Sequence, residues 1–222
     1  MKDISIFDVI GPNMIGPSSS HTAGALRISL IAYKMMKSDV VEADFILYGS
    51  FAQTYKGHGT DRALLGGVMG FGTEDERIRD AFNIADQSGL KYSFSTNETD
   101  KDVHPNTVEM ILTNSKGEKK LIRGESIGGG NVQITRIDDA KLMFTGEYKT
   151  LIVKYNDHAG VIAHITKALG DFDVNIAFMR TYREEKGMIA TGIIEADEYI
   201  SPEVLEIVKQ HEDVLSAQMI EM

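Results

Sequence analysis

The chain has 222 residues, which is enough for two modest hydrophobic cores, since domains commonly hold about 100–150 residues. Its net charge of -10 argues against a nucleic-acid partner, and the absence of any apolar run of about 18 residues argues against a membrane span. Cysteine is absent, which excludes disulfides, thiol nucleophiles and iron–sulfur ligation by this chain. The acidic segment 1–13 lacks a secretory signal, so we expect a cytoplasmic protein.

The part of the chain up to about Gly146 is rich in glycine, and its predicted elements are irregular. Pro17 and three serines precede an apolar stretch, which predicts a buried helix over 22–36. The apolar run 45–48 predicts a short buried strand that leads into a glycine-rich turn. Further along, the pattern predicts a helix over 63–69, a helix that begins with a capping box at Thr73–Glu76 and ends near Gly89, a hairpin of strands over 107–113 and 119–125, and a strand over 132–137.

From about Tyr148 the sequence becomes regular and predicts the order β-α-β-β-α-β. Such an order forms an antiparallel sheet with both helices on one face. We therefore predict a mixed α+β or α/β chain of two domains, 1–147 and 148–222. The predicted strands of the second domain are 150–155, 174–182, 188–196 and 214–220, and its predicted helices are 160–169 and 202–210.

Five consecutive hydroxyl or imidazole side chains stand at the start of the first helix, within Gly16–Gly24 (GPSSSHTAG). Free backbone N–H groups and hydroxyls at a helix start can bind a carboxylate or another small anion. Plain helix capping needs only one hydroxyl, so the segment exceeds the structural requirement. The five candidates for binding are Ser18, Ser19, Ser20, His21 and Thr22.

Two histidines lie in turns that suit acid–base chemistry. His58 stands between two glycines in Lys56–Asp61, on a turn from a strand to a helix, where its imidazole can be approached. His104 precedes Pro105 and Asn106, which stiffen the turn and offer an amide to a ligand. Each also has an ordinary interpretation, since His58 could satisfy a carbonyl and a loop histidine such as His104 is usually solvated.

Three consecutive glycines, Gly128–Gly130, follow the predicted hairpin. They permit close approach of the backbone to a ligand, although a turn or a bulge explains them equally well. The segment lacks the pattern of a nucleotide-binding loop, and the histidines are not spaced for a zinc site within one helix. We therefore predict no metal ligands in this chain.

The motifs stand in a fixed order: Gly16–Gly24, Tyr48–Ser50, Gly57–Asp61 (GHGTD), His104–Asn106 and Ser126–Gly130 (SIGGG). In that order they resemble the β subunit of the bacterial iron–sulfur L-serine dehydratase over essentially the whole chain. The serine-rich segment and GHGTD are the most specific of them. The region from Tyr148 resembles an ACT domain, since 156–161 matches the D-x-x-G-V turn of that family.

The resemblance implies a serine dehydratase β-type domain, similar to the allosteric substrate-binding domain of some D-3-phosphoglycerate dehydrogenases, followed by the ACT domain. It implies conversion of L-serine to pyruvate and ammonia with a cysteine-containing α subunit, which ligates a 4Fe–4S cluster. His58 and His104 would be the two acid–base residues, one at Cα and one near the leaving oxygen that cluster iron polarises. Which of the two is the base stays open.

The other site residues follow from the same resemblance. Amino-acid effectors of ACT domains bind near the first turn, often between paired ACT domains, so self-association is also implied. The substrate would contact Ser18, Ser19, Ser20, His21, Thr22, Asn106, Gly128 and Gly129. An effector would contact Asn156, Asp157, His158, Gly160 and Val161.

Two other classes of function are weighed against the dehydratase. A regulatory protein could bind serine in the first domain and transmit the signal through the ACT domain without any catalysis. A fragment of an NAD-linked dehydrogenase is not supported, because no G-x-G-x-x-G motif follows a strand.

Overall fold

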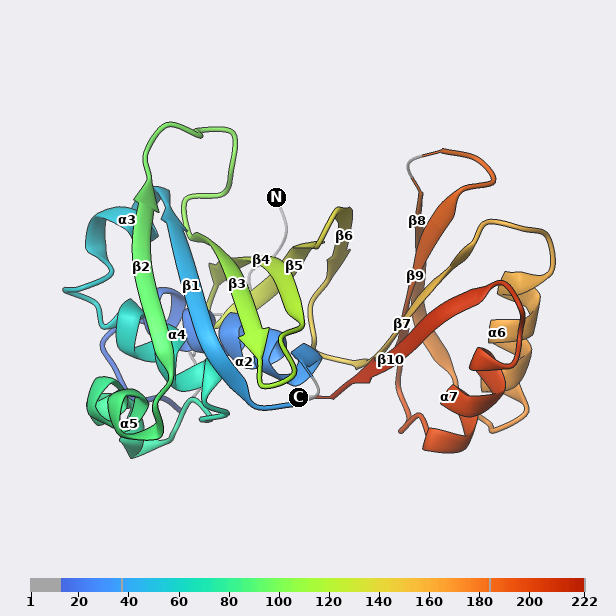
Figure 1. Ribbon diagram of the computed structural model, residues 1–222, viewed down its shortest axis with the longest axis horizontal. Helices are drawn as coiled ribbons and strands as arrows, with labels where there is room; N and C mark the ends of the chain where they lie inside the picture. The colour runs from blue at the N-terminus through green and yellow to red at the C-terminus, as the bar shows by residue number, and fades with distance from the viewer. Residues whose placement is uncertain (1–12, 37, 184, 222) are drawn as a thin grey trace. The chain divides into compact units, whose positions relative to one another are not determined.

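The computed structural model describes residues 13–36, 38–183 and 185–221, so most of the N-terminal segment in which no signal peptide is predicted lies outside the described residues. The chain divides into two compact units, Met1–Asp138 and Asp139–Met222 (Figure 1). The predicted boundary between two functional domains, 1–147 and 148–222, remains a prediction. None of the helices in the described ranges is long and apolar enough to cross a membrane.

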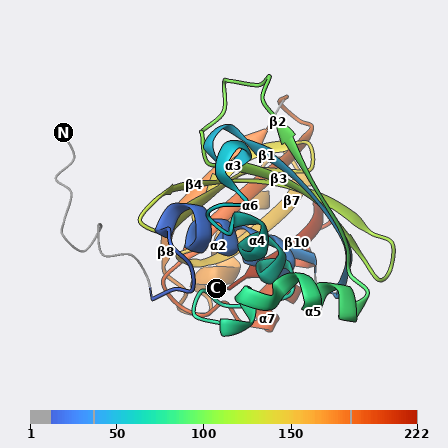
Figure 2. The ribbon, with the colours of Figure 1, turned by 90° about the vertical axis from the view of Figure 1, so that its left-hand side faces the viewer.

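In the described part of the first unit, the π-helix η1 (Ser19–Gly24) continues directly into α2 (Ala25–Met36), in agreement with the predicted helix. Helices α4 and α5 lie side by side in both views (Figures 1 and 2). The remaining helices of this unit are α3 (Gly49–Thr54), α4 (Thr60–Val68), the 3-10 helix η2 (Glu76–Asp80) and α5 (Ala81–Ser88).

The larger sheet has the strand order β2-β1-β3-β4-β5-β6. Strand β1 pairs in parallel with β2 and antiparallel with β3, and β4 pairs antiparallel with both β3 and β5. The strands are β1 (Val40–Tyr48), β2 (Lys91–Asn97), β3 (Thr107–Asn114), β4 (Lys119–Gly128), β5 (Asn131–Ile137) and β6 (Ala140–Phe144).

Two glycines let α2 lie close to its neighbours. A Cβ atom at Gly67 of α4 would lie 2.6 Å from the Leu26 carbonyl oxygen and 2.8 Å from the Leu30 nitrogen. A Cβ atom at Gly124 of β4 would overlap the fully buried Ile28 of α2. Because α2 is fixed against both α4 and β4, the preceding η1 segment is held beside the same two elements.

The second unit contains the predicted β-α-β-β-α-β order, with an antiparallel sheet β10-β7-β9-β8. Both helices pack on one face of this sheet, because Val161 and Ile165 of α6 share a core with Val204 and Val208 of α7. The elements are β7 (Lys149–Asn156), α6 (Val161–Gly170), β8 (Ile176–Arg183), β9 (Ile189–Ala196), α7 (Pro202–Lys209) and β10 (Val214–Ile220).

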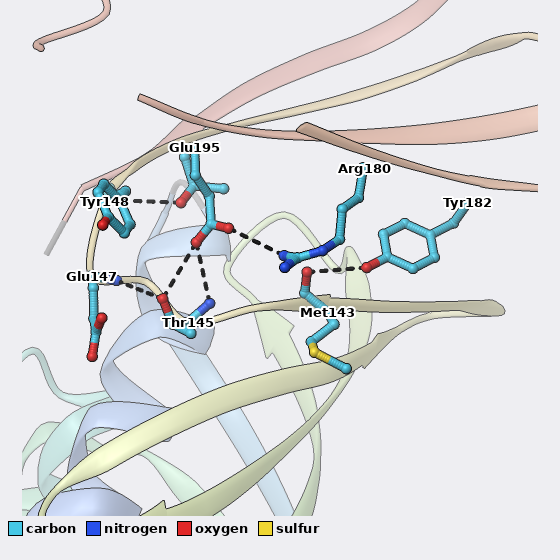
Figure 3. A network of polar contacts seen from close by, with 8 residues as sticks. Met143, Thr145, Glu147, Tyr148, Arg180, Tyr182 and Glu195 are labelled. Carbon is cyan, nitrogen blue, oxygen red and sulfur yellow. Dashed lines mark hydrogen bonds and ion pairs between the residues drawn. The ribbon is translucent and has the colours of Figure 1, made fainter. Parts of the chain in front are cut away.

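A buried carboxylate joins the start of this unit to its sheet (Figure 3). Glu195 of β9 is 3% exposed and accepts hydrogen bonds from the Thr145 nitrogen at 3.4 Å and the Thr145 hydroxyl at 3.3 Å. Arg180 of β8 approaches the other carboxylate oxygen at 3.5 Å, and the Tyr182 hydroxyl donates to the Met143 carbonyl at 3.2 Å. Segment 143–145 is therefore bound to β8 and β9 of the same unit.

The predicted capping box at Thr73–Glu76 is wrong. Asp75 caps the 3-10 helix by accepting a hydrogen bond from the Arg77 nitrogen at 2.9 Å. The Thr73 hydroxyl instead donates to the Asn13 carbonyl at 3.2 Å, so it is engaged by a segment distant in sequence. The expected end of the following helix is confirmed, because Gly89 takes a left-handed conformation with φ 75° after Ser88.

Candidate active site

The serine-rich segment forms a tight turn into the π-helix η1. Ser18 caps it, because its hydroxyl oxygen accepts a hydrogen bond from the His21 backbone nitrogen at 3.1 Å. Gly16 has φ +123°, and a Cβ atom there would lie 2.9 Å from the Thr22 hydroxyl. π-Helical turns are rare, and those that occur often lie at functional sites. The fold therefore holds this segment in an unusual backbone conformation.

His21 connects this segment to two others. Its Nε2 atom lies 2.9 Å from the hydroxyl oxygen of Ser50, in α3. Its ring centroid lies 4.8 Å from that of His58 in an edge-to-face arrangement, and the Thr22 hydroxyl donates to the His58 carbonyl at 3.0 Å. Burial, and then electrostatic repulsion from the nearby His58 ring, lower the pKa of His21, which favours its neutral form.

His58 lies on the turn between α3 and α4, which corrects the expectation that it directly follows a strand. Its backbone nitrogen donates to the Thr54 carbonyl at 3.0 Å, and Gly59 at φ 69° then starts α4. The Nδ1 atom of His58 is buried without a hydrogen-bond partner among the described residues, and so is the hydroxyl of the neighbouring Thr60.

The His104 loop lies against the start of α3. The Pro105 carbonyl accepts a hydrogen bond from the Phe51 nitrogen at 3.3 Å, and a Cβ atom at Gly49 would lie 2.7 Å from the Pro105 Cα. Within the loop, the Asn106 backbone nitrogen donates to Nδ1 of His104 at 3.2 Å. His104 is therefore linked to the His21–Ser50 pair through the first turn of α3.

Ser126 of β4, the first residue of the motif Ser126–Gly130, joins this motif to the rest of the site. Its backbone nitrogen donates to the Asn106 carbonyl at 3.0 Å, and the Asn106 amide donates to the Ser126 carbonyl at 3.4 Å. A Cβ atom at Gly24 of η1 would lie 2.8 Å from the Ser126 Cβ. The hydroxyl of Ser126 is buried without a partner in the part of the chain that the structure describes.

The glycine segment after Ser126 has the backbone conformation that only glycine adopts readily. Gly128, Gly129 and Gly130 have φ values of 106°, 62° and 83°. The Gly130 carbonyl accepts a hydrogen bond from Arg27 of α2 at 2.9 Å. At Gly128 there is open space where a side chain would stand, so a ligand can approach the backbone there.

All five motifs therefore form one connected cluster, although they span more than a hundred residues of sequence. Buried polar atoms in proteins are ordinarily paired, and unpaired ones call for an explanation such as a ligand. The unpaired atoms of this cluster are Nδ1 of His58, Oγ1 of Thr60 and Oγ of Ser126. They mark the places where this cluster has hydrogen-bonding capacity that no described residue uses.

Comparison with known proteins agrees with this arrangement. The family model described as "Serine dehydratase beta chain" matches residues 5–136, and the ACT domain model matches residues 149–213. The "L-serine dehydratase, beta chain" of Peptoniphilus asaccharolyticus is 38% identical over 222 residues, which is the whole of both chains. This chain belongs to the serine dehydratase β-chain family.

Two further relatives extend the comparison. The "Probable L-serine dehydratase, beta chain" of Bacillus subtilis (strain 168) is 40% identical over 220 residues, covering 99% of each chain. A D-3-phosphoglycerate dehydrogenase of Methanocaldococcus jannaschii is 27% identical over 124 residues, which are 56% of this chain and 23% of that enzyme. The expected membership of the β-chain family is confirmed, and the match to the dehydrogenase is weaker and covers only part of each chain.

This serine dehydratase β chain does not offer the ligand set of a 4Fe–4S cluster. Such clusters are held by cysteine thiolates, and the sequence has no cysteine. Within residues 13–36, 38–183 and 185–221, no group of three histidine or acidic side chains is placed to hold a metal ion.

The first turn of the ACT domain is held by ion pairs. Asp157 accepts from Arg183 at 2.6 Å and from the Gly187 nitrogen at 3.3 Å, and the hydrogen bond from Arg183 lowers the pKa of Asp157. Nδ1 of His158 lies 2.9 Å from Asp213, to which the Asn156 amide also donates at 3.3 Å. The predicted effector-contacting role of this turn is not tested by these contacts.

Two residues of the predicted effector site, Gly160 and Val161, offer no accessible side chain to an effector. Gly160 has φ 99° and starts α6, while the Val161 side chain is fully buried in the core. Only the backbone of Val161 is therefore available to an effector in this conformation. The side chains that would contact a side chain or charged group of an effector are therefore those of Asn156, Asp157 and His158.

Proposed function

We propose that this chain is the β subunit of a cytoplasmic L-serine dehydratase that converts L-serine to pyruvate and ammonia with a cysteine-bearing α chain. The carrying observation is the cluster of five motifs with unpaired, buried polar atoms, in a chain whose full-length relatives are named L-serine dehydratase β chains. The word "beta" in those names supports a second chain. Since this chain lacks thiolates, a 4Fe–4S cluster would take its ligands from that α chain.

The two acid–base histidines differ in a way that suggests their roles. Nδ1 of His104 accepts the Asn106 N–H, so the neutral ring carries its proton on Nε2 and presents a donor to a ligand. Nδ1 of His58 has no partner among the described residues and is free to receive a proton. We therefore assign His58 as the base at Cα of serine and His104 as the donor near the departing oxygen.

The hydroxyls of η1 and its flanking residues would hold the substrate. Ser18, Ser19, Ser20 and Thr22 lie on the same short segment as His21, and Thr22 also fixes the His58 carbonyl. Asn106, Gly128 and Gly129 would approach the substrate from the other side, because Asn106 and the glycine segment are both joined to Ser126.

The ACT domain would bind an amino-acid effector at Asn156–Val161 and would pair with a second ACT domain. The support is the match of the ACT family model over 149–213 and the charged, partly exposed turn held by Arg183 and Asp213. Under this proposal the functional boundary lies between 147 and 148, so that one domain carries chemistry and the other regulation.

The test is anaerobic co-expression of both chains, with pyruvate formed from L-serine as the measurement. We expect turnover by the pair and by neither chain alone. His58→Asn and His104→Asn should each lower turnover by about 10²–10⁴-fold, the usual contribution of a positioned acid or base. The control is His164→Gln, whose amide can still donate to the Ile207 carbonyl that His164 contacts at 2.8 Å.

Three results would contradict parts of the proposal. Near-normal turnover by both histidine variants would remove the acid–base assignment. Full activity of this chain without a partner would remove the two-chain arrangement. Serine binding without turnover, even with the α chain present, would favour the regulatory alternative that the likeness to D-3-phosphoglycerate dehydrogenase suggests.

A further inference from the structure

The sequence motifs assign no role to Ser50, although its position in the structure is distinctive. It lies in the first turn of α3, half-buried, and its hydroxyl oxygen is 2.9 Å from Nε2 of His21. On its other side, the neighbouring Gly49 lies against the backbone of Pro105. The Ser50 hydroxyl is therefore placed between the His21–His58 pair and the loop that carries His104.

The hydrogen bonds of His21 decide what the Ser50 hydroxyl can do. A neutral imidazole donates from one nitrogen and accepts at the other. Nδ1 of His21 lies 3.4 Å from the Ser18 hydroxyl, so a donation by Ser18 to Nδ1 leaves the proton of His21 on Nε2, directed at Ser50. In this tautomer Ser50 accepts from His21, and no described residue accepts the Ser50 proton, which leaves it for an acceptor outside the chain.

The missing acceptor has a defined chemistry. Among the described residues, the interaction partners of His21 are His58, Ser18, Ser50 and Phe51, and none of them carries a carboxylate. A carboxylate can only accept hydrogen bonds, so it pairs with a hydroxyl whose own oxygen is already engaged by a donor. The substrate's ammonium group can only donate, so at this position it would leave the Ser50 proton without an acceptor.

We propose that Ser50 binds the α-carboxylate of the substrate, with His21 as the positioning residue that directs the Ser50 hydroxyl toward it. This inference rests on the proposed function and names the substrate group that this part of the site recognises. The lowered pKa of His21, which burial and the nearby His58 cause, supports it, because a neutral His21 can accept from Ser18 while donating to Ser50.

The experiment uses the assembled two-chain enzyme and compares L-serine with L-alanine. L-Alanine has the same carboxylate and ammonium group but no leaving hydroxyl, so its inhibition constant reports binding of these two groups without any contribution from the leaving oxygen. Ser50→Ala should raise the KM for L-serine and the inhibition constant for L-alanine in parallel, by about tenfold to a hundredfold, as expected for losing one hydrogen bond to a charged group. Ser50→Thr, which keeps the hydroxyl, should restore most of both.

His21 is tested by a double substitution. His21→Asn should raise the same two constants, and adding Ser50→Ala should raise them little further, because both changes remove one contact. The matched control is Thr54→Val, which removes another hydroxyl of α3, one that donates to the Ser50 carbonyl at 2.7 Å. It should leave the L-alanine inhibition constant within about twofold of the wild type if the contact is with Ser50 itself.

Each other outcome overturns the inference. Unchanged constants in Ser50→Ala mean that Ser50 does not contact the substrate. A lower kcat with an unchanged L-alanine inhibition constant means that Ser50 serves the leaving oxygen instead. An equal effect of Thr54→Val means that α3 acts only as structure. Lack of serine turnover by the wild-type pair would instead remove the proposed function itself, which distinguishes the two failures.

Discussion

Gly24 is the point at which the serine-rich segment meets the strand that leads to the glycine segment. A Cβ atom at Gly24 would lie 2.8 Å from the Ser126 Cβ, whereas ordinary contact begins at 3.4 Å, so Gly24→Ala must part the two segments by about 0.6 Å. Rotation of the Ser126 side chain cannot relieve this overlap, because its Cβ atom does not move on rotation. The η1 segment has to shift.

That shift is large enough to break the site. The bonds from Thr22 to His58 and from His21 to Ser50 are 3.0 and 2.9 Å long, and lengthening them by about 0.6 Å takes them past the useful range for hydrogen bonds. Overpacking costs about 1–3 kcal/mol, and replacing a helical glycine by alanine returns about 0.5–1 kcal/mol. We expect a net loss of about 1–2 kcal/mol, with turnover reduced by about tenfold or more.

Urea denaturation and the pyruvate assay measure the two effects. In the double variant Gly24→Ala/Ser126→Gly, the loss of unfolding free energy should be smaller than the sum of the losses in the two single variants. The reason is that the overlapping Cβ atom of Ser126 is removed. Gly72→Ala is the matched control, since a Cβ atom there meets nothing within 4 Å. Strictly additive costs, or a Gly24→Ala variant with wild-type stability and turnover, would refute the close approach of η1 and β4.

Three further predictions concern packing and charge. Gly67→Ala should lower thermal stability by about 1–3 kcal/mol, because the new methyl group meets the α2 backbone, while Gly170→Ala, with no neighbour within 4 Å, should not. The folded-state pKa of His21 lies below its ordinary 6.5, so the unfolded chain gains the proton first and stability falls as the pH drops below that value. In urea titrations at pH 7.5 and 5.5, His21→Asn should therefore lose less stability on acidification than the wild type. Glu195→Ala leaves Thr145 unpaired and should cost about 1–3 kcal/mol by the same denaturation assay, unlike a surface carboxylate.

The elements that could be read from the sequence are those with a strong local pattern. The hairpin of β3 and β4 and the whole ACT domain alternate or repeat apolar residues at the right spacing, and both are confirmed. Strand β2 was missed because its residues Lys91–Asn97 are mostly polar and partly exposed, and it pairs in parallel with β1, which is distant in sequence. The local sequence contains no pattern that predicts such a pairing.

The candidate site divides in the same way. Crowded hydroxyls around His21 and glycines around His58 are unusual compositions, so they drew attention without a structure. Ser50 and Ser126 stand within the motifs Tyr48–Ser50 and Ser126–Gly130, but the sequence assigns neither serine a role. Only the contacts of α3 with His21 and of β4 with Gly24 reveal that their hydroxyls face the same cluster.

The close contacts of the cluster indicate a site that is assembled before the substrate arrives. Gly49 lies against Pro105 and Gly24 against Ser126, and neither contact leaves room for a methyl group. Contacts of this kind come from the packing of η1 and α2 against β4 and of α3 against β3. Because this packing fixes the backbone around His58 and Ser126, a substrate that hydrogen-bonds to them does so without the cost of ordering the chain around it.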